Sequence, residues 1–127
     1  MNKFILLSLL FAATTAVACG NKGSAPQAAV SAKAMTEARE TFKGRCGVCH
    51  GNEGRGDGPG AAALTPKPRN FTDASWHRTA KDEDIKKTIL MGGAAVGKSP
   101  SMPASPDLES QPELVEALVA VVREFKR

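Results

Sequence analysis

Two cysteines and a histidine lie close together in the chain, in Cys46-Gly-Val-Cys49-His50. This C-x-x-C-H spacing is typical of covalent haem attachment. Two thiols at this spacing can reach the two vinyl groups of one porphyrin and form thioethers, and the adjacent histidine can then bind the iron. We therefore predict one covalently attached haem c per chain, anchored by Cys46 and Cys49, with His50 as an axial ligand.

Other chemistries fit these residues less well. A thioredoxin-like C-x-x-C opens a helix after a strand, whereas this one ends a helical pattern and no strand pattern precedes it. A structural zinc site needs more ligands at suitable spacing, and only His77 and the distant Cys19 remain. A disulfide between the two cysteines would leave His50 without a role.

Glycines follow the motif at close intervals, from Gly51 to Gly60. Because glycine tolerates positive φ, they predict a chain that turns tightly beside a flat cofactor. Arg55-Gly56-Asp57 matches a cell-adhesion tripeptide, but matches of this length arise readily by chance. A dinucleotide-binding loop must follow a strand and open a helix, so we reject that interpretation.

A second axial ligand must come from another part of the chain. Met102 lies in the irregular segment "GKSPSMPAS", between prolines that can hold its thioether rigidly, and we favour it. Met91 ends a helical pattern, where packing in the core is the simpler role. His77 is expected at the surface, and Met35 lies upstream. Met91, His77 or an open iron site remain as alternatives.

Helices must position these residues. Met35, Ala38, Phe42 and Cys46 recur along one helical face and predict a first helix that leads into the motif. A second helix is expected over about 81–91, with acidic residues in its first turn, Thr79 as its N-cap and a glycine pair at its end.

The third predicted helix runs to the C-terminus. Ser110-x-x-Glu113 matches a capping box, and a buried stripe follows: Leu114, Leu118, Val121, Val122 and Phe125. The segments 51–79 and 92–107 are rich in glycine and proline and show no strand pattern. Long loops are unusual unless they have a function, so we predict an all-α fold, three main helices and irregular loops wrapped around a haem.

The N-terminal segment predicts export. A basic start and the short apolar run "FILLSLLFAATTAVA" indicate a signal peptide over residues 1–18. The following Cys19 resembles the acylated cysteine of bacterial lipoproteins, although ordinary cleavage that leaves a free thiol is the alternative. Residues 19–31 are small and polar and predict a flexible tether, which leaves 32–127 as the domain. We expect a periplasmic protein with a lipid anchor at Cys19.

Charge and composition narrow the class further. The net charge is +4, without a dense run of Lys or Arg, so nucleic acid is not an expected partner. The chain has no tyrosine and one tryptophan, and two of its five phenylalanines precede residue 19. Such a small domain often needs a cofactor to complete its core.

With these motifs, the chain resembles a class I monohaem c-type cytochrome over about 34–125. The resemblance rests on four segments: "CGVCHGNEGRGDGPG", "PKPRNFTDASW", "ILMGGAAVGKSPSMPA" and the final amphipathic helix. It implies N- and C-terminal helices that cross beside the haem, with Phe42 and Ala38 at the crossing. The family often has a tyrosine near the methionine or the crossing, and Val121 is expected to fill the crossing position here.

The resemblance also implies roles for single residues. His50 would be the proximal ligand and Met102 the distal one. Pro59 would accept a hydrogen bond from His50 through its carbonyl, with Pro66 as the alternative. Arg69 and Trp76 would lie near the haem propionates.

A six-coordinate haem of this type implies an electron carrier rather than an enzyme, a monomer that exchanges electrons with redox protein partners. Basic residues around the loops could steer an acidic partner: Arg55, Lys67, Arg69 and Lys98. The alternatives are a haem subunit of an oxidase or dehydrogenase, or a gas-binding or peroxidase-like protein with an open iron. A diheme peroxidase is excluded because no second C-x-x-C-H is present.

Overall fold

The computed structural model describes residues 29–127, so the predicted signal peptide, Cys19 and most of the predicted tether lie outside the described residues. One long helical run opens the described chain. It consists of α1 (Ala32–Thr41), a π-helical turn η1 (Phe42–Cys46) and α2 (Gly47–His50). Ser31 begins it as N-cap, because its side-chain oxygen accepts a hydrogen bond from the Ala34 N–H at 3.2 Å.

The face predicted for the first helix is confirmed. Ala38 and Phe42 are buried, and Met35 and Cys46 are half-buried against the same core. The π-helical turn carries this face from α1 into the cysteine–histidine motif, and it includes Gly44 at a position open to solvent. The motif is therefore an extension of the helix that anchors the fold.

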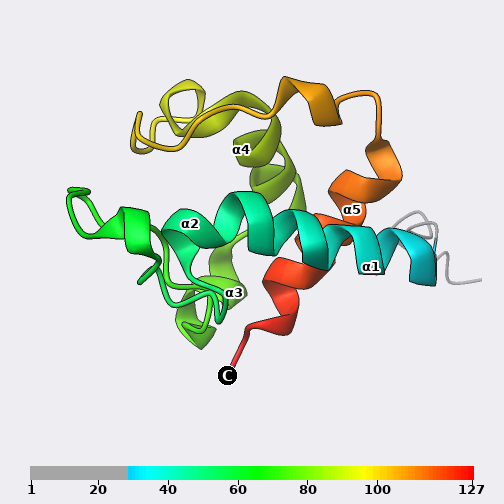
Figure 1. The fold of residues 1–127 in the computed structure, drawn as a ribbon, viewed down its shortest axis with the longest axis horizontal. Helices are drawn as coiled ribbons and strands as arrows, with labels where there is room; N and C mark the ends of the chain where they lie inside the picture. The colour runs from blue at the N-terminus through cyan, green and yellow to red at the C-terminus, as the bar shows by residue number, and fades with distance from the viewer. Residues whose placement is uncertain (1–28) are drawn as a thin grey trace, which may run out of the picture.

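Helix α5 (Pro112–Glu124) crosses α1 and forms the other half of this anchor (Figure 1). The predicted stripe is confirmed, since Leu114, Leu118, Val121 and Val122 are buried. Phe125, directly after the helix, packs against Phe42 with 4.9 Å between ring centroids. An aromatic pair therefore adds to the contact between α1 and α5, and Val121, which the sequence suggested for the crossing, is also buried on α5.

The predicted capping box at the start of this helix is wrong. Gln111 is the N-cap, no side chain caps the helix, and Pro112 occupies its first turn. Proline suits this position because its fixed φ matches the helix and its missing N–H would have no partner there. The Glu113 carboxylate instead accepts a hydrogen bond from the Ser31 backbone N–H at 3.0 Å, so it links the beginnings of α1 and α5.

Helix α4 (Asp82–Ala95) corresponds to the second predicted helix. Its first turn contains Asp82, Glu83 and Asp84, as expected for the positive end of a helix dipole. Thr79 is not its cap: Lys81 is the N-cap residue, and the Thr79 hydroxyl donates to the Trp76 carbonyl. The regular helix breaks at Gly92, which has φ 77°, and one more turn follows to Ala95.

A further short α-helix, α3 (Ala74–Thr79), lies in a segment that we expected to be irregular. The Asp73 carboxylate caps it, because its Oδ1 accepts from the N–H groups of Ser75 and Trp76 at 2.8 and 3.4 Å. A helix of this length is too short to show a periodic apolar pattern. Two 3-10 turns, η2 (Pro59–Ala61) and η3 (Pro106–Leu108), complete the helical elements.

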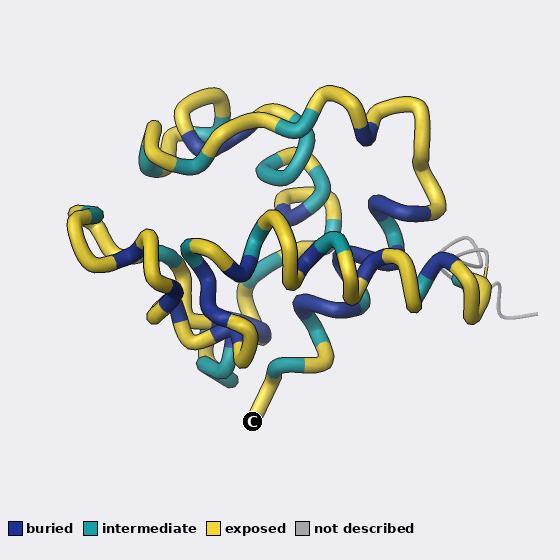
Figure 2. The backbone as a smooth tube through the Cα atoms, in the orientation of Figure 1, coloured by how far each residue is buried: buried dark blue, intermediate teal, exposed yellow. Residues whose placement is uncertain are grey.

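No strand occurs within residues 29–127, and the all-α fold is confirmed. The buried residues follow the inner sides of α1 and α5, whereas the loops that pass over the motif are largely exposed (Figure 2). Buried side chains outside α1 and α5 reach into the same core: Phe71 from the loop before α3, Ile85 from α4 and Leu108 from η3. The loops are thus attached to the helix crossing by a few apolar side chains.

Candidate functional site

The helical run α1–η1–α2 places the two cysteines next to each other. Cys46 is the last residue of η1, and Cys49 lies one turn further along α2. Residues three apart on a helix are surface neighbours, so both thiols lie on the same side of the run. Both are free and half-buried, and burial raises the pKa of the Cys46 thiol, with Arg45 opposing. The pair can therefore anchor one flat group at two points.

His50 ends α2 and is buried, with 9% of its surface exposed. Its Nδ1 lies 3.1 Å from the Arg69 carbonyl oxygen. A carbonyl can only accept, so Nδ1 is the protonated nitrogen and donates this bond. Burial lowers the pKa of His50, and the Arg69 carbonyl opposes that shift. Nε2 forms no hydrogen bond within residues 29–127, so a neutral imidazole keeps a free lone pair there.

The acceptor of the His50 hydrogen bond was predicted incorrectly. The accepting carbonyl belongs to Arg69, not to Pro59 or Pro66. Pro59 opens η2 after a turn in which the Gly58 N–H donates to the Cys49 carbonyl at 3.1 Å. This turn sends the chain along the backbone of α2 rather than past the ring edge of His50. The chain reaches the ring only after Pro68, at a place that sequence spacing alone could not assign.

Phe71 covers the face of the His50 ring. The two ring centroids are 4.4 Å apart and the planes differ by 15°. The Phe71 N–H donates to the Gly54 carbonyl at 2.6 Å, which attaches this segment to the glycine-rich turn. The stretch from Arg69 to Phe71 therefore holds His50 at its edge and at its face. Sequence reasoning missed the role of Phe71, because an aromatic residue in an irregular segment has no spacing pattern that would place it beside His50.

His77 is not at the surface, contrary to the prediction. It is 9% exposed, its Nε2 lies 2.6 Å from the Phe71 carbonyl, and its Nδ1 lies 3.1 Å from Arg123 Nη1. Both ring nitrogens are thus engaged, which argues against His77 as an iron ligand. Trp76 is half-buried, with its ring 5.3 Å from that of Phe71 and 5.9 Å from the Arg123 guanidinium carbon.

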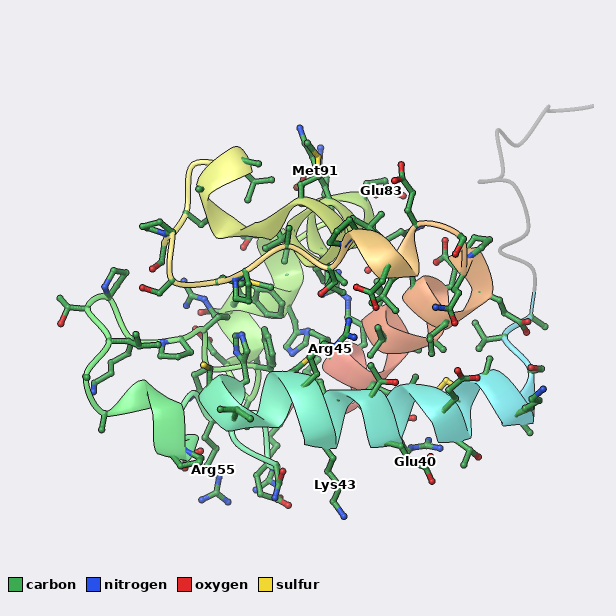
Figure 3. The ribbon with its side chains drawn as sticks, turned by 45° about the horizontal axis from the view of Figure 1, so that its top comes forward. Glu40, Lys43, Arg45, Arg55, Glu83 and Met91 are labelled. Atoms are coloured by element: carbon green, nitrogen blue, oxygen red, sulfur yellow. The ribbon has the colours of Figure 1, made fainter. Side chains whose placement is uncertain are left out.

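The two downstream methionines have different environments. Met91 is 51% exposed and points away from the body of the molecule (Figure 3), so the expected core packing is wrong. Met102 is half-buried in the loop after α4. This loop is pinned by the Gly93 N–H, which donates to the Met102 carbonyl at 3.0 Å, and by the Met102 N–H, which donates to the Ser99 carbonyl at 3.2 Å. Met35 packs against the core from α1.

The basic residues around the loops are not equivalent. Lys67 donates to the carbonyls of Ala61 and Ala62 at 2.9 and 2.8 Å, so it stabilises η2. Arg55, Arg69 and Lys98 are exposed. Among residues 29–127 no three His, Cys, Asp or Glu side chains gather in a way that could hold a metal ion. In the same range no helix is both long and apolar enough to cross a membrane.

The residues of the motif fit a covalently attached haem. Two neighbouring free thiols can form the thioethers, and a neutral imidazole whose Nδ1 is bound to a carbonyl can offer Nε2 to iron. The hydrogen bond at Nδ1 fixes the tautomer that metal binding requires. Cys46, Cys49 and His50 would hold the group, and haem supplies one-electron redox chemistry when it is bound.

Comparison with known proteins agrees with this chemistry. The family model for cytochrome c matches residues 35–125. A solved structure, the KustC0563 c-type cytochrome, is similar with a TM-score of 0.53 and 34% identity, over 71% of this chain and 98% of that chain. A search of curated proteins found no match. The chain therefore belongs to the cytochrome c family and is a class I c-type cytochrome with an all-α fold.

Proposed function

We propose that this protein is a one-electron carrier whose haem iron is bound by His50 and Met102. The family supports haem-based electron transfer and implies covalently bound haem c. The observation that carries the proposal is His50, whose Nδ1 is bound to the Arg69 carbonyl and whose Nε2 is left unbonded within the described chain. This arrangement makes the imidazole a better donor to iron and fixes its orientation.

Met102 is the best supported second ligand among the candidates. Met91 is exposed, Met35 packs in the core, and both nitrogens of His77 are engaged. Met102 is half-buried in a loop that hydrogen bonds on both sides of it pin to the end of α4. With His50 and Met102 bound, no iron position is left for a substrate, and methionine ligation raises the reduction potential. A carrier is favoured over a gas-binding or peroxidase-like protein for this reason.

We propose that the carrier acts in the periplasm, as a monomer that exchanges electrons with redox proteins of a membrane and of the periplasm. c-type cytochromes are typically exported, and the first 18 residues match an export signal. Arg55, Arg69 and Lys98 are exposed and available to an acidic partner, whereas Lys67 is engaged in η2. We also propose that Arg69 and Trp76 lie near the haem propionates, where a cation or an indole N–H stabilises a carboxylate.

Acylation of Cys19 would tether the carrier to a membrane. Two or three acyl chains anchor a protein stably, whereas a single chain binds only marginally. We expect radiolabelled palmitate to be incorporated into the wild-type protein and not into Cys19→Ala. Incorporation into neither would mean ordinary signal cleavage and a protein without an anchor.

The visible spectrum of the holoprotein tests the ligand assignment. We expect a low-spin c-type spectrum, a weak red methionine-to-iron band in the ferric state, and no change when carbon monoxide is added to the reduced protein. Met102→Ala should abolish the red band and allow carbon monoxide to bind. Met91→Ala is the matched control, because an exposed methionine on α4 can be removed without effect on the iron.

Three outcomes would contradict the proposal. A high-spin wild-type spectrum would indicate an open site, and gas binding or catalysis would then replace electron transfer. Loss of the red band in Met91→Ala but not in Met102→Ala would show that Met91, and not Met102, binds the iron. Co-purification of stoichiometric amounts of a dehydrogenase or oxidase would make the protein a fixed subunit rather than a free carrier.

A further inference from the structure

His77 is a buried histidine that the proposed site does not use directly. Its Nε2 lies 2.6 Å from the Phe71 carbonyl oxygen, and its Nδ1 lies 3.1 Å from Arg123 Nη1. A guanidinium can only donate and a carbonyl can only accept. The neighbours of His77 therefore fix a neutral ring that carries its proton on Nε2 and donates it to Phe71.

Arg123 holds His77 in place. Its Nε and Nη2 bind one oxygen of Asp82 at 2.9 and 2.7 Å, and Nη2 also donates to the Ala80 carbonyl at 2.6 Å. Its Nη1 donates to the His77 carbonyl at 3.2 Å, in addition to the ring. One side chain of α5 thus joins α3 and the start of α4, which lie beside the end of α5 in Figure 1. Such a multiply bonded arginine has little freedom to move.

Phe71 connects this cluster to His50. Its carbonyl is fixed by His77 and its N–H by the Gly54 carbonyl, at 2.6 Å in each case. Its ring stacks on the His50 imidazole at 4.4 Å, and two residues earlier the Arg69 carbonyl accepts the hydrogen bond from His50 Nδ1. The segment 69–71, which contacts the edge and the face of His50, is therefore fixed through both the N–H and the carbonyl of Phe71.

We propose that His77, held by Arg123, is a positioning residue that orients the proximal imidazole through Phe71. The proposal rests on His50 as an axial ligand. Without the His77 donor, the buried Phe71 carbonyl loses its partner and the segment 69–71 is free to shift. The bond from His50 to Arg69 then weakens, the imidazole donates less charge to the iron, and the ferric form is stabilised less. The reduction potential should rise.

Three variants of the holoprotein test this role. His77→Leu removes the donor, whereas the amide of His77→Gln can still donate to the Phe71 carbonyl. Val119→Ala is the control, because Val119 is a buried apolar residue of α5 and no hydrogen bond of this cluster involves its side chain. Redox titration gives the potential, urea unfolding gives the stability, and nitrogen NMR of the reduced wild-type protein locates the His77 proton.

His77→Leu should raise the potential by about 30 mV, which is a threefold change in the one-electron equilibrium at 59 mV per tenfold. His77→Gln should restore most of the wild-type value, and Val119→Ala should lose stability without a shift in potential. A wild-type potential in His77→Leu, or an equal shift in Val119→Ala, would overturn the proposal.

If His77→Leu does not fold, NMR of the wild-type protein tests the proposal instead. A proton on Nε2 with coupling to the Phe71 carbonyl supports the proposal, and a proton on Nδ1 refutes it. Failure of the ligand assignment is distinguishable, because it would remove the low-spin spectrum of the wild-type protein and leave the His77 nitrogen shifts unaffected.

Discussion

Gly58 lies where the chain turns back against α2, and its backbone leaves no room for a side chain. Its N–H donates to the Cys49 carbonyl, and a Cβ there would overlap the carbonyl oxygens of Gly47 and Val48. Gly44, in η1, has open space around it. The two glycines show why the type of a residue does not reveal its role: one permits a close approach between backbones, and the other only weakens a helix.

This contrast predicts opposite effects of one substitution. Gly58→Ala should lower the free energy of unfolding by about 1–3 kcal/mol, since backbone atoms must move to admit the methyl group. Gly44→Ala should raise it by about 0.5–1 kcal/mol, because alanine favours the helix. Urea unfolding of both holoproteins measures the difference, and equal effects would contradict the close approach at Gly58.

At the scale of elements, a bidentate ion pair joins the helical run to η3. Arg45 Nη1 and Nη2 each lie 2.9 Å from Asp107 Oδ2, and Nη1 lies 3.2 Å from Oδ1. In Figure 3 Arg45 lies on the side of the helix that faces the rest of the chain, whereas Lys43 points away. Asp107 lies in η3, directly after the loop that contains Met102, so this pair attaches the end of that loop next to Cys46. Both side chains are about half exposed, so their attraction is screened by solvent.

The pair makes stability depend on pH. The Arg45 guanidinium lowers the pKa of the Asp107 carboxyl. A lowered folded-state pKa contributes stability above the unfolded value, near 4, that is lost as the pH falls through the folded value. Asp107→Asn should therefore unfold more readily than the wild type at pH 7, and the gap should close below pH 4.

Urea midpoints across this pH range measure the effect. Glu109→Gln, an exposed change in the same region, is the control. A gap that stays constant down to pH 2 would mean that the ion pair does not contribute. Loss of the red methionine band in Asp107→Asn at pH 7 would further show that the pair holds Met102.

At the scale of the whole molecule, the core is small and sits mainly at the crossing of α1 and α5. The loops are attached to it by few apolar side chains, and one of these, Phe71, stacks on His50. Domains with so little core often need a cofactor to fold stably. A group that binds only the folded chain adds its binding free energy to the stability.

Removal of the haem should therefore destabilise the entire fold. Cys46→Ser with Cys49→Ser cannot form thioethers, and this variant should lose most of its helical circular dichroism or unfold at a much lower urea concentration. The Cys46→Ser single variant, which keeps one thioether, should be intermediate. A double variant as stable as the holoprotein would show that the helix crossing is sufficient by itself.

The sequence by itself determined the helical class, the three long helices, the break at Gly92 and the cysteine–histidine motif. These features are local: apolar residues at helical spacing must be buried together, and the motif needs neighbouring residues only. The short helix α3 was not predicted, because its only sequence signal is the N-cap residue Asp73. The predicted capping roles of Ser110 and Thr79 were wrong, because Glu113 accepts a tertiary hydrogen bond from Ser31 and the Thr79 hydroxyl donates locally to the Trp76 carbonyl.

Only the tertiary structure decided which groups surround His50. The Arg69 carbonyl and the Phe71 ring come from a loop whose path depends on backbone turns and not on residue types, and His77 of α3 holds this loop from behind. A carbonyl acceptor has no signature in a sequence, because every residue carries one. A short sequence motif therefore predicts the chemistry of this protein, while the orientation of His50 depends on contacts between segments that are separated in the chain.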